Sequence, residues 1–257
     1  MIPIIPWYIT LISLTTNLVI AVAVWAILSS ATGESGLAPD VQRKVRIGTA
    51  GFLGTWLGAA LLLAPAPETL RLQDPFTLTP LIPLFVMVPI SLALLVIGLS
   101  PTIRRVIAAA SLPAIVGVQL YRVIGVVFLI LLAQGQLPAH FALPAGWGDV
   151  AVGLSAPLVA VALARGFWGG RTIAAAWNVF ALVDLVVAVG MGSGFLAPIL
   201  SPELGPRVAP APAMGVFPLI LVPTFAVPVS VLLHLIALAR LSQKGKLDWR
   251  PVPRTSS

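Results

Sequence analysis

Seven long apolar stretches, separated by short polar segments, run along the chain. They cover roughly residues 7–29, 45–64, 78–99, 107–133, 149–165, 172–192 and 216–239. Each is long enough for a helix that crosses the hydrocarbon layer of a membrane, which takes about 20 residues. The stretches are continuously apolar, whereas strands of a membrane barrel alternate apolar and polar residues. The pattern therefore predicts an all-α integral membrane bundle of seven transmembrane helices over residues 1–239, followed by a basic tail over 240–257.

The composition supports a membrane protein and excludes two other classes. Of the 257 residues, 59% are hydrophobic and only 9% are charged, whereas a soluble domain carries about 25% charged residues. A disordered chain is excluded as well, because disorder requires low hydrophobicity and high charge. We therefore expect a multi-pass protein of the cell membrane whose partners include membrane lipids. Cysteine is absent, which excludes disulfides and thiolate metal sites.

The basic residues predict the orientation of the bundle. The net charge is +7, and twelve of the fifteen Lys and Arg residues fall on alternate connections or on the tail. The other connections hold only Arg71 and Arg207, and Arg122 lies within a span. Because cytoplasmic connections are enriched in Lys and Arg, the amino end is predicted outside and the carboxyl end inside. This spread along the chain argues against a nucleic-acid partner, which would require a clustered basic surface.

Two pairs of segments suggest an internal repeat. Residues 88–92 resemble residues 227–231, and the segment around Trp7 resembles the segment around Trp147, at offsets of 139 and 140. Both pairs would cross the membrane in the same direction, as in a parallel repeat of three plus one plus three spans. Parallel repeats occur in transporters, and the layout resembles that of the SWEET sugar transporters. Apolar helices also resemble one another by composition alone, so both interpretations remain open.

Arg122 and Asp184 are the first candidates for a functional site, because ionisable residues within a membrane are costly and usually have a role. The helical rise places Arg122 roughly 24 Å and Asp184 roughly 20 Å from the inner face. The two depths agree, so we predict that the side chains pair. Gln119 lies three residues before Arg122 and shares its helix face. The pair either forms a substrate or ion site near the midplane, or holds two helices together.

Three further polar residues are candidates with plainer alternatives. Asn178 lies within a span and is expected to bind a solute or to hydrogen-bond between helices. Asp149 is expected to cap the start of its helix; if that helix begins later, it would point toward Arg122 instead. His140 belongs to an uncharged connection, residues 134–148, that contains two Pro and three Gly. This connection is expected to fold over the outer end of the bundle, either as a lid or as a flat connector.

The most favoured function is the binding or passage of a small solute or ion through a cavity near the midplane. Arg122 would set a preference for anions, and Asp184 would balance its charge. The alternative is a scaffold, sensor or subunit of a larger membrane complex, with an oligomer or partner subunit. An enzyme is the least favoured class, since no nucleophile and base are paired in the sequence. We predict neither a metal site nor a cofactor, because His140 and His234 lie too far apart to share a haem iron.

Overall fold

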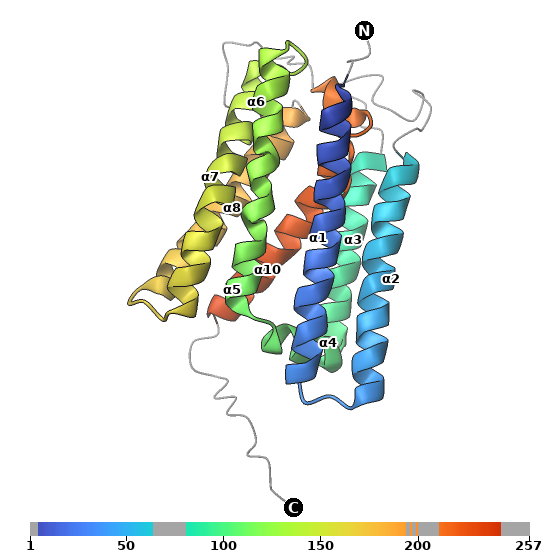
Figure 1. The fold of residues 1–257 in the computed structure, drawn as a ribbon, viewed down its shortest axis with the longest axis vertical. Coiled ribbons are helices and arrows are strands. Elements are labelled where there is room, and N and C mark those ends of the chain that lie inside the picture. The colour runs from blue at the N-terminus through green and yellow to red at the C-terminus, as the bar shows by residue number, and fades with distance from the viewer. Residues whose placement is uncertain (1–4, 64–80, 194–195, 197–198, 200–210, 243–257) are drawn as a thin grey trace, which may run out of the picture.

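The computed structural model describes residues 5–63, 81–193, 196, 199 and 211–242, and within these residues all regular structure is helical. Most of the helices lie side by side with their long axes close to one direction, as Figure 1 shows. The elements in chain order are α1 (Trp7–Glu34), α2 (Pro39–Leu63), α3 (Leu81–Leu99), α4 (Pro101–Ala109), α5 (Leu112–Gly117), η2 (Val118–Gly125), α6 (Val126–Ala133), α7 (Ala139–Ala164), α8 (Gly170–Gly192), η4 (Pro212–Gly215), η5 (Val222–Ala226) and α10 (Val227–Ser242).

Six of the continuous helical segments are long and apolar enough to cross a membrane. A seventh crossing is obtained if α3 and α4, which meet at a bend of 98°, are counted as one broken span. The number of candidate spans among the described residues, six or seven, is thus within one of the seven predicted apolar stretches. Large apolar side chains cover much of the outer surface, for example Leu158 (73% exposed) and Val186 (64% exposed). Such a surface is typical of a protein surrounded by lipid rather than water.

The predicted span over residues 107–133 begins later than expected, at Leu112. Two helices begin in this region, each with a serine at its N-cap and a proline in its first turn. Ser100 precedes Pro101 and its Oγ accepts a hydrogen bond from Ile103 N at 3.2 Å. Ser111 likewise caps α5 through Ala114 N at 3.3 Å. Because each serine begins a new helix, residues 101–109 form the separate helix α4 rather than the start of a span.

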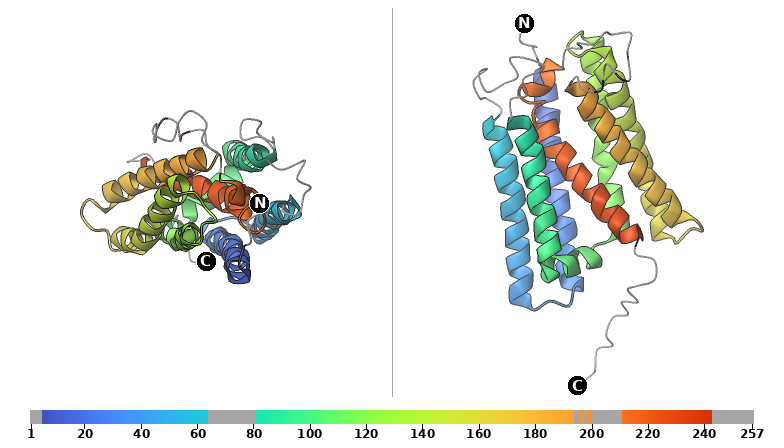
Figure 2. Two further views of the ribbon diagram at one scale, coloured as in Figure 1. Left: turned by 90° about the horizontal axis from the view of Figure 1, so that it is seen from above. Right: turned by 180° about the vertical axis from the view of Figure 1, so that it is seen from behind.

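The segments that carry most of the basic residues meet at one end of the bundle. The connection from α1 to α2, the helix α4, the connection from α7 to α8 and the final residues of α10 all lie at the lower end in Figure 1. The start of α1 and the connection from α6 to α7 lie at the opposite end, and Figure 2 shows the same arrangement from behind. The tail residues after 242 and the segments with Arg71 and Arg207 fall outside the described residues.

Helix α10 begins with an unusual backbone. The five residues of η5 form a π-helix, and α10 continues directly from it. Pro228 has no N–H to give the carbonyl group four residues earlier, that of Thr224. The indole Nε1 of Trp56, from α2, donates a hydrogen bond to that Thr224 carbonyl at 2.8 Å. A side chain of a distant helix therefore satisfies a backbone group that the proline leaves free, and the link fixes α2 against η5.

Close helix contacts through glycine occur in a different place from the one the sequence indicates. Gly54 and Gly58 of α2 form a small-residue motif that allows close packing of helices, but a Cβ atom at either position would meet no atom of the described residues within 4 Å. The tight approach lies between η2 and α7. A Cβ on Gly153 would come within 2.4 Å of the Val123 nitrogen, and one on Gly125 within 2.4 Å of Asp149 Cβ.

Candidate functional site

A stretch of 3-10 helix in the middle of a span presents the central polar residues. The continuous segment Leu112–Ala133 is α-helical at both ends, but η2 has three residues per turn. Residues three apart therefore eclipse one another, and the three buried residues of η2 follow this spacing: Gln119, Arg122 and Gly125. The prediction that Gln119 shares a face with Arg122 is confirmed. A 3-10 run of eight residues is uncommon and often marks a functional or strained segment.

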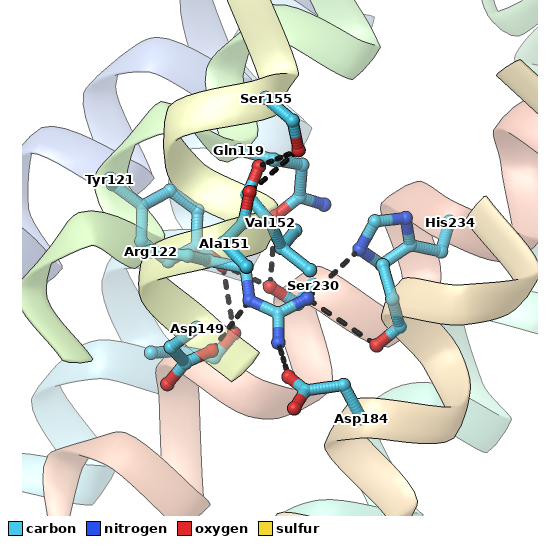
Figure 3. Close-up of polar contacts among 12 residues, drawn as sticks. Gln119, Tyr121, Arg122, Asp149, Ala151, Val152, Ser155, Asp184, Ser230 and His234 are labelled. Carbon is cyan, nitrogen blue, oxygen red and sulfur yellow. Dashed lines mark hydrogen bonds and ion pairs between the residues drawn. The ribbon is translucent and has the colours of Figure 1, made fainter. Parts of the chain in front are cut away.

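The guanidinium group of Arg122 is 2% exposed and contacts three other helices (Figure 3). Its Nε donates to Asp149 Oδ1 of α7 at 2.6 Å, and its Nη2 forms an ion pair with Asp184 Oδ2 of α8. Its Nη1 lies 3.4 Å from the Ala181 carbonyl oxygen and 3.5 Å from Nε2 of His234 on α10. We call Arg122, Asp149 and Asp184 the Arg122 cluster.

The Arg122 cluster lies near the middle of the spans that carry it. Arg122 is the eleventh of 22 residues in Leu112–Ala133, Asp149 is the eleventh of 26 in α7, and Asp184 is the fifteenth of 23 in α8. Since the span of Arg122 begins at Leu112, the guanidinium-bearing residue is about 15 Å along the helix from that end rather than 24 Å. Arg122 therefore lies at least ten residues from either end of its span.

Glycine residues make room for the carboxylate groups. A Cβ on Gly148 would lie 1.7 Å from Asp184 Oδ1, so this carboxylate rests directly over the α7 backbone. A Cβ on Gly125 would meet Asp149 Cβ at 2.4 Å and the Gly146 carbonyl oxygen at 2.9 Å. The absence of side chains at these glycines thus lets α7 and α8 bring two carboxylates onto one guanidinium.

The charges of the Arg122 cluster do not balance. One guanidinium, which is always protonated in proteins, faces two carboxylates whose side chains are 14% and 8% exposed. With both carboxylates ionised, the cluster would carry one excess negative charge. Removal of an ion from water costs several kcal/mol unless a partner compensates it. A cluster of this composition therefore favours uptake of one positive charge.

His234 and Asn178 extend the Arg122 cluster into a wider polar network. His234 Nδ1 lies 2.7 Å from Asn178 Oδ1, and the Asn178 amide donates to the Ala174 carbonyl at 2.7 Å. A guanidinium can only donate hydrogen bonds, so His234 Nε2 accepts and Nδ1 carries the proton donated to Asn178. The Trp177 ring packs against the imidazole, with centroids 5.4 Å apart. His234 is therefore held as a neutral imidazole in one orientation.

A second branch of the network contains one unused donor. Ser230 Oγ, one helical turn before His234 on α10, donates to Gln119 Oε1 at 3.0 Å. The hydroxyl of Tyr121 contacts Ser230 Oγ and the Ala226 carbonyl, the latter at 3.2 Å. Gln119 is fully buried, yet its Nε2 has no hydrogen-bond partner among the described residues. Buried polar atoms are rarely left unpaired, so this amide could receive a water or a polar ligand.

The structure confirms one pairing and corrects another prediction. Arg122 and Asp184 form the ion pair that their depths predict. Asp149 is not a helix cap: α7 begins at Ala139, with Pro138 at its N-cap position, and Asp149 lies ten residues farther along. It points toward Arg122 because the helix begins earlier than predicted, not later. The sequence predicts a preference for anions from Arg122 paired with Asp184 alone. Asp149 adds a second carboxylate, so the cluster has no excess positive charge that would attract an anion.

The predicted connection over residues 134–148 is mostly helix. Only Gln134–Pro138 links α6 to α7, and residues 139–148 form the first turns of α7. Phe141 is 3% exposed and packs against Phe128 rather than at the membrane surface. Neither a lid nor a flat connector is present in these residues. His140 lies in the first turn of the same helix, nine residues before Asp149, and none of the hydrogen bonds described for the cluster involves it.

Tyr121, Ser230 and His234 belong to the network but were not among the site residues predicted from the sequence. A signal was available for two of them, since Ser230 and His234 are four residues apart and share a helix face. Asn178 and Asp184 are six residues apart and do not share one face. Both nevertheless enter the network, because His234 and Arg122 contact different parts of α8.

Comparison with known protein families shows a match over most of the chain. A family model described as "Domain of unknown function (DUF8737)" matches residues 79–242. This region extends from the start of α3 to the end of α10 and includes every residue of the Arg122 cluster and its network. Neither a curated protein nor a solved structure matches the chain.

Proposed function

The chain belongs to the DUF8737 family, and we propose that it is an integral membrane protein that binds a small ion, in the simplest case a proton, at the Arg122 cluster and passes it across the membrane. The observation that carries this proposal is the charge of the cluster, one guanidinium against two carboxylates. A proton on either carboxylate would make the cluster neutral. Carboxylates within a membrane are a common feature of proton pathways.

Three further features support an ion pathway at this position. The Arg122 cluster lies near the middle of its spans, where transporters place their binding sites. The unpartnered Gln119 Nε2 gives the same network a free donor, to which a water or a solute group could bind. The 3-10 helix η2 carries part of this network and is joined to the π-helix η5, since Tyr121 of η2 bonds to the Ala226 carbonyl at the end of η5. Such segments are often found at functional sites.

Proton flux into vesicles tests the proposal. The purified protein is reconstituted into liposomes that contain a pH-sensitive dye, and a potassium diffusion potential drives protons inward. We expect acidification to be faster with the wild type than with the D149N or D184N variant, because one amide in place of a carboxylate leaves a neutral pair that needs no proton. Equal rates for the wild type and both variants would reject proton passage.

A structural role is the second candidate. Arg122 is 2% exposed, and its Nε, Nη1 and Nη2 atoms all have partners within the bundle. A guanidinium that is fully occupied in this way could simply lock α7, α8 and α10 around η2. The protein would then be a scaffold, sensor or subunit of a larger membrane complex. This alternative predicts that the D149N and D184N variants change stability without any change in proton flux.

We propose seven spans in the cell membrane, with the amino end outside and the carboxyl end inside. The basic segments gathered at one end of the bundle support this orientation (Figure 1). Counting α3 and α4 as one broken span gives the odd number that it requires. α1, α3, α7 and α10 all run from the upper to the lower end of the bundle in Figure 1, as a parallel repeat requires. The repeat itself stays a prediction.

The absence of cysteine allows the orientation to be tested with single-cysteine variants. Gln136 lies in the connection from α6 to α7, and Phe167, which is 56% exposed, lies in the connection from α7 to α8. A membrane-impermeant maleimide should label the Q136C variant in intact cells and the F167C variant only after permeabilisation. The reverse pattern, or labelling of both variants in intact cells, would contradict the proposed orientation.

A further inference from the structure

A large apolar cavity lies on the opposite side of α10 from α8. Its volume is about 530 Å³, and side chains from α1, α2, α3, α4, α5 and α10 line it. This volume falls within the range of about 300–1,000 Å³ that is typical of small-molecule sites. None of the residues of the Arg122 cluster lines it. The cavity is therefore a separate feature of the bundle, with no part in the proposed ion site.

The cavity extends from the basic end of the bundle toward its interior. Lys44 of α2 contributes to the lining near the start of that helix, and Trp56 contributes twelve residues later, roughly 18 Å along the helix. Ser100 and Thr102, at the bend between α3 and α4, belong to the lining at the same end as Lys44. Apart from such polar groups, the lining is made almost wholly of aliphatic and aromatic side chains.

The charges around this end favour an anionic occupant. Five basic side chains, all exposed, lie on α2 and α4, namely Arg43, Lys44, Arg46, Arg104 and Arg105. Two acidic residues, Glu34 and Asp40, lie nearby on α1 and α2. The Lys44 ammonium is 3.9 Å from Asp40, and both side chains are more than two-thirds exposed. An exposed pair of this kind is worth little, so the ammonium group can bind another anion instead.

We propose that this cavity binds an anionic phospholipid, with an acyl chain in the apolar part and the phosphate at Lys44. The surroundings supply this ligand directly, because exposed apolar side chains on α3, such as Met87 and Leu95, face outward from the bundle as lipid-facing residues do. Basic residues at the membrane surface attract anionic headgroups. The proposal depends on the protein being embedded in a membrane and is independent of proton binding.

Native mass spectrometry of the detergent-solubilised protein tests this proposal, with phosphatidylglycerol and phosphatidylcholine of the same chain length as probes. Gly48 lines the cavity and Gly51 does not, and a Cβ at either position would meet nothing within 4 Å. We expect the G48F variant to lose the retained phosphatidylglycerol, because the ring fills the cavity. The G51F variant is the matched control and should retain it. A thermal unfolding curve for each variant verifies the fold.

A second pair of variants tests whether the charge of Lys44 contributes to lipid binding. The K44Q variant should weaken phosphatidylglycerol binding about fivefold, the equivalent of about 1 kcal/mol for one basic residue at a membrane surface. The R165Q variant, altered at an exposed arginine in the connection from α7 to α8 and outside both the lining and the five basic residues named above, should bind as the wild type does. Equal retention by the G48F and G51F variants would overturn the proposal, as would equal retention of the two lipids by the wild type. If the G48F variant does not fold, the comparison of K44Q with R165Q decides.

Discussion

The R122Q variant should lose about 3–5 kcal/mol of its free energy of unfolding, the cost that is typical of removing one partner of a buried ion pair. Arg122 is 2% exposed and supplies the positive charge that two carboxylates contact. Without it, at least one ionised carboxylate of Asp149 and Asp184 would be left buried and unpaired. The measurement is denaturant-induced unfolding in detergent micelles, followed by circular dichroism.

Neutralising the carboxylates at the same time distinguishes charge from packing. The triple variant R122Q/D149N/D184N should recover most of the lost stability, because no charge then remains unpaired. R105Q is the control: Arg105 is exposed on α4, and a surface substitution of this kind changes stability by about 0.5 kcal/mol or less. If the triple variant is as unstable as R122Q alone, the loss comes from the shape of the arginine side chain and not from its charge.

The G153A variant should be destabilised by about 3 kcal/mol, at the upper end of what overpacking usually costs. The added Cβ would lie 2.4 Å from the Val123 nitrogen and 3.0 Å from the Arg122 carbonyl carbon. Backbone atoms cannot rotate away as a flexible side chain can, so α7 and η2 would have to separate. That separation would also lengthen the contact between Arg122 and Asp149. Thermal unfolding of the reconstituted protein measures the effect.

Gly117 provides the matched control for this substitution. It precedes η2 in the same span, and a Cβ there would meet only Ala160 Cβ, at 3.4 Å. The G117A variant should therefore be as stable as the wild type or slightly more so, because alanine favours a helix over glycine by roughly 0.5–1 kcal/mol. Equal stability of the G153A and G117A variants would show that α7 and η2 are not in the close contact described above.

The pairing of Arg122 with Asp184 could be predicted from one sequence because a membrane imposes two simple constraints. A charged group within hydrocarbon requires a partner, and the fixed rise of a helix converts residue number into depth. These constraints predict the pair correctly, although the span that contains Arg122 begins at Leu112, five residues later than predicted. Ser100 and Ser111 are each followed closely by proline, a pattern that predicts a helix start at each serine and so a later start for this span.

The role of Asp149 could not be predicted, because the rules for loops come from proteins in water. Two Pro and three Gly within residues 134–148 would end a helix in a soluble protein. Within a membrane, packing against neighbouring helices tolerates them, and here Gly146 and Gly148 create the space for Leu129 and Asp184. The hydrogen bonds around His234 could not be predicted either, because they join different helices and depend on how η2, α8 and α10 pack together.

An infrared spectrum of the protein in a lipid bilayer tests the central claim most directly, that the Arg122 cluster holds a proton. The carbonyl stretch of a protonated aspartic acid is resolved from that of a carboxylate and shifts when aspartate is labelled with carbon-13. At neutral pH we predict one such band in the wild type and its loss in both the D149N and the D184N variants. A wild-type spectrum in which every aspartate is ionised would contradict the account.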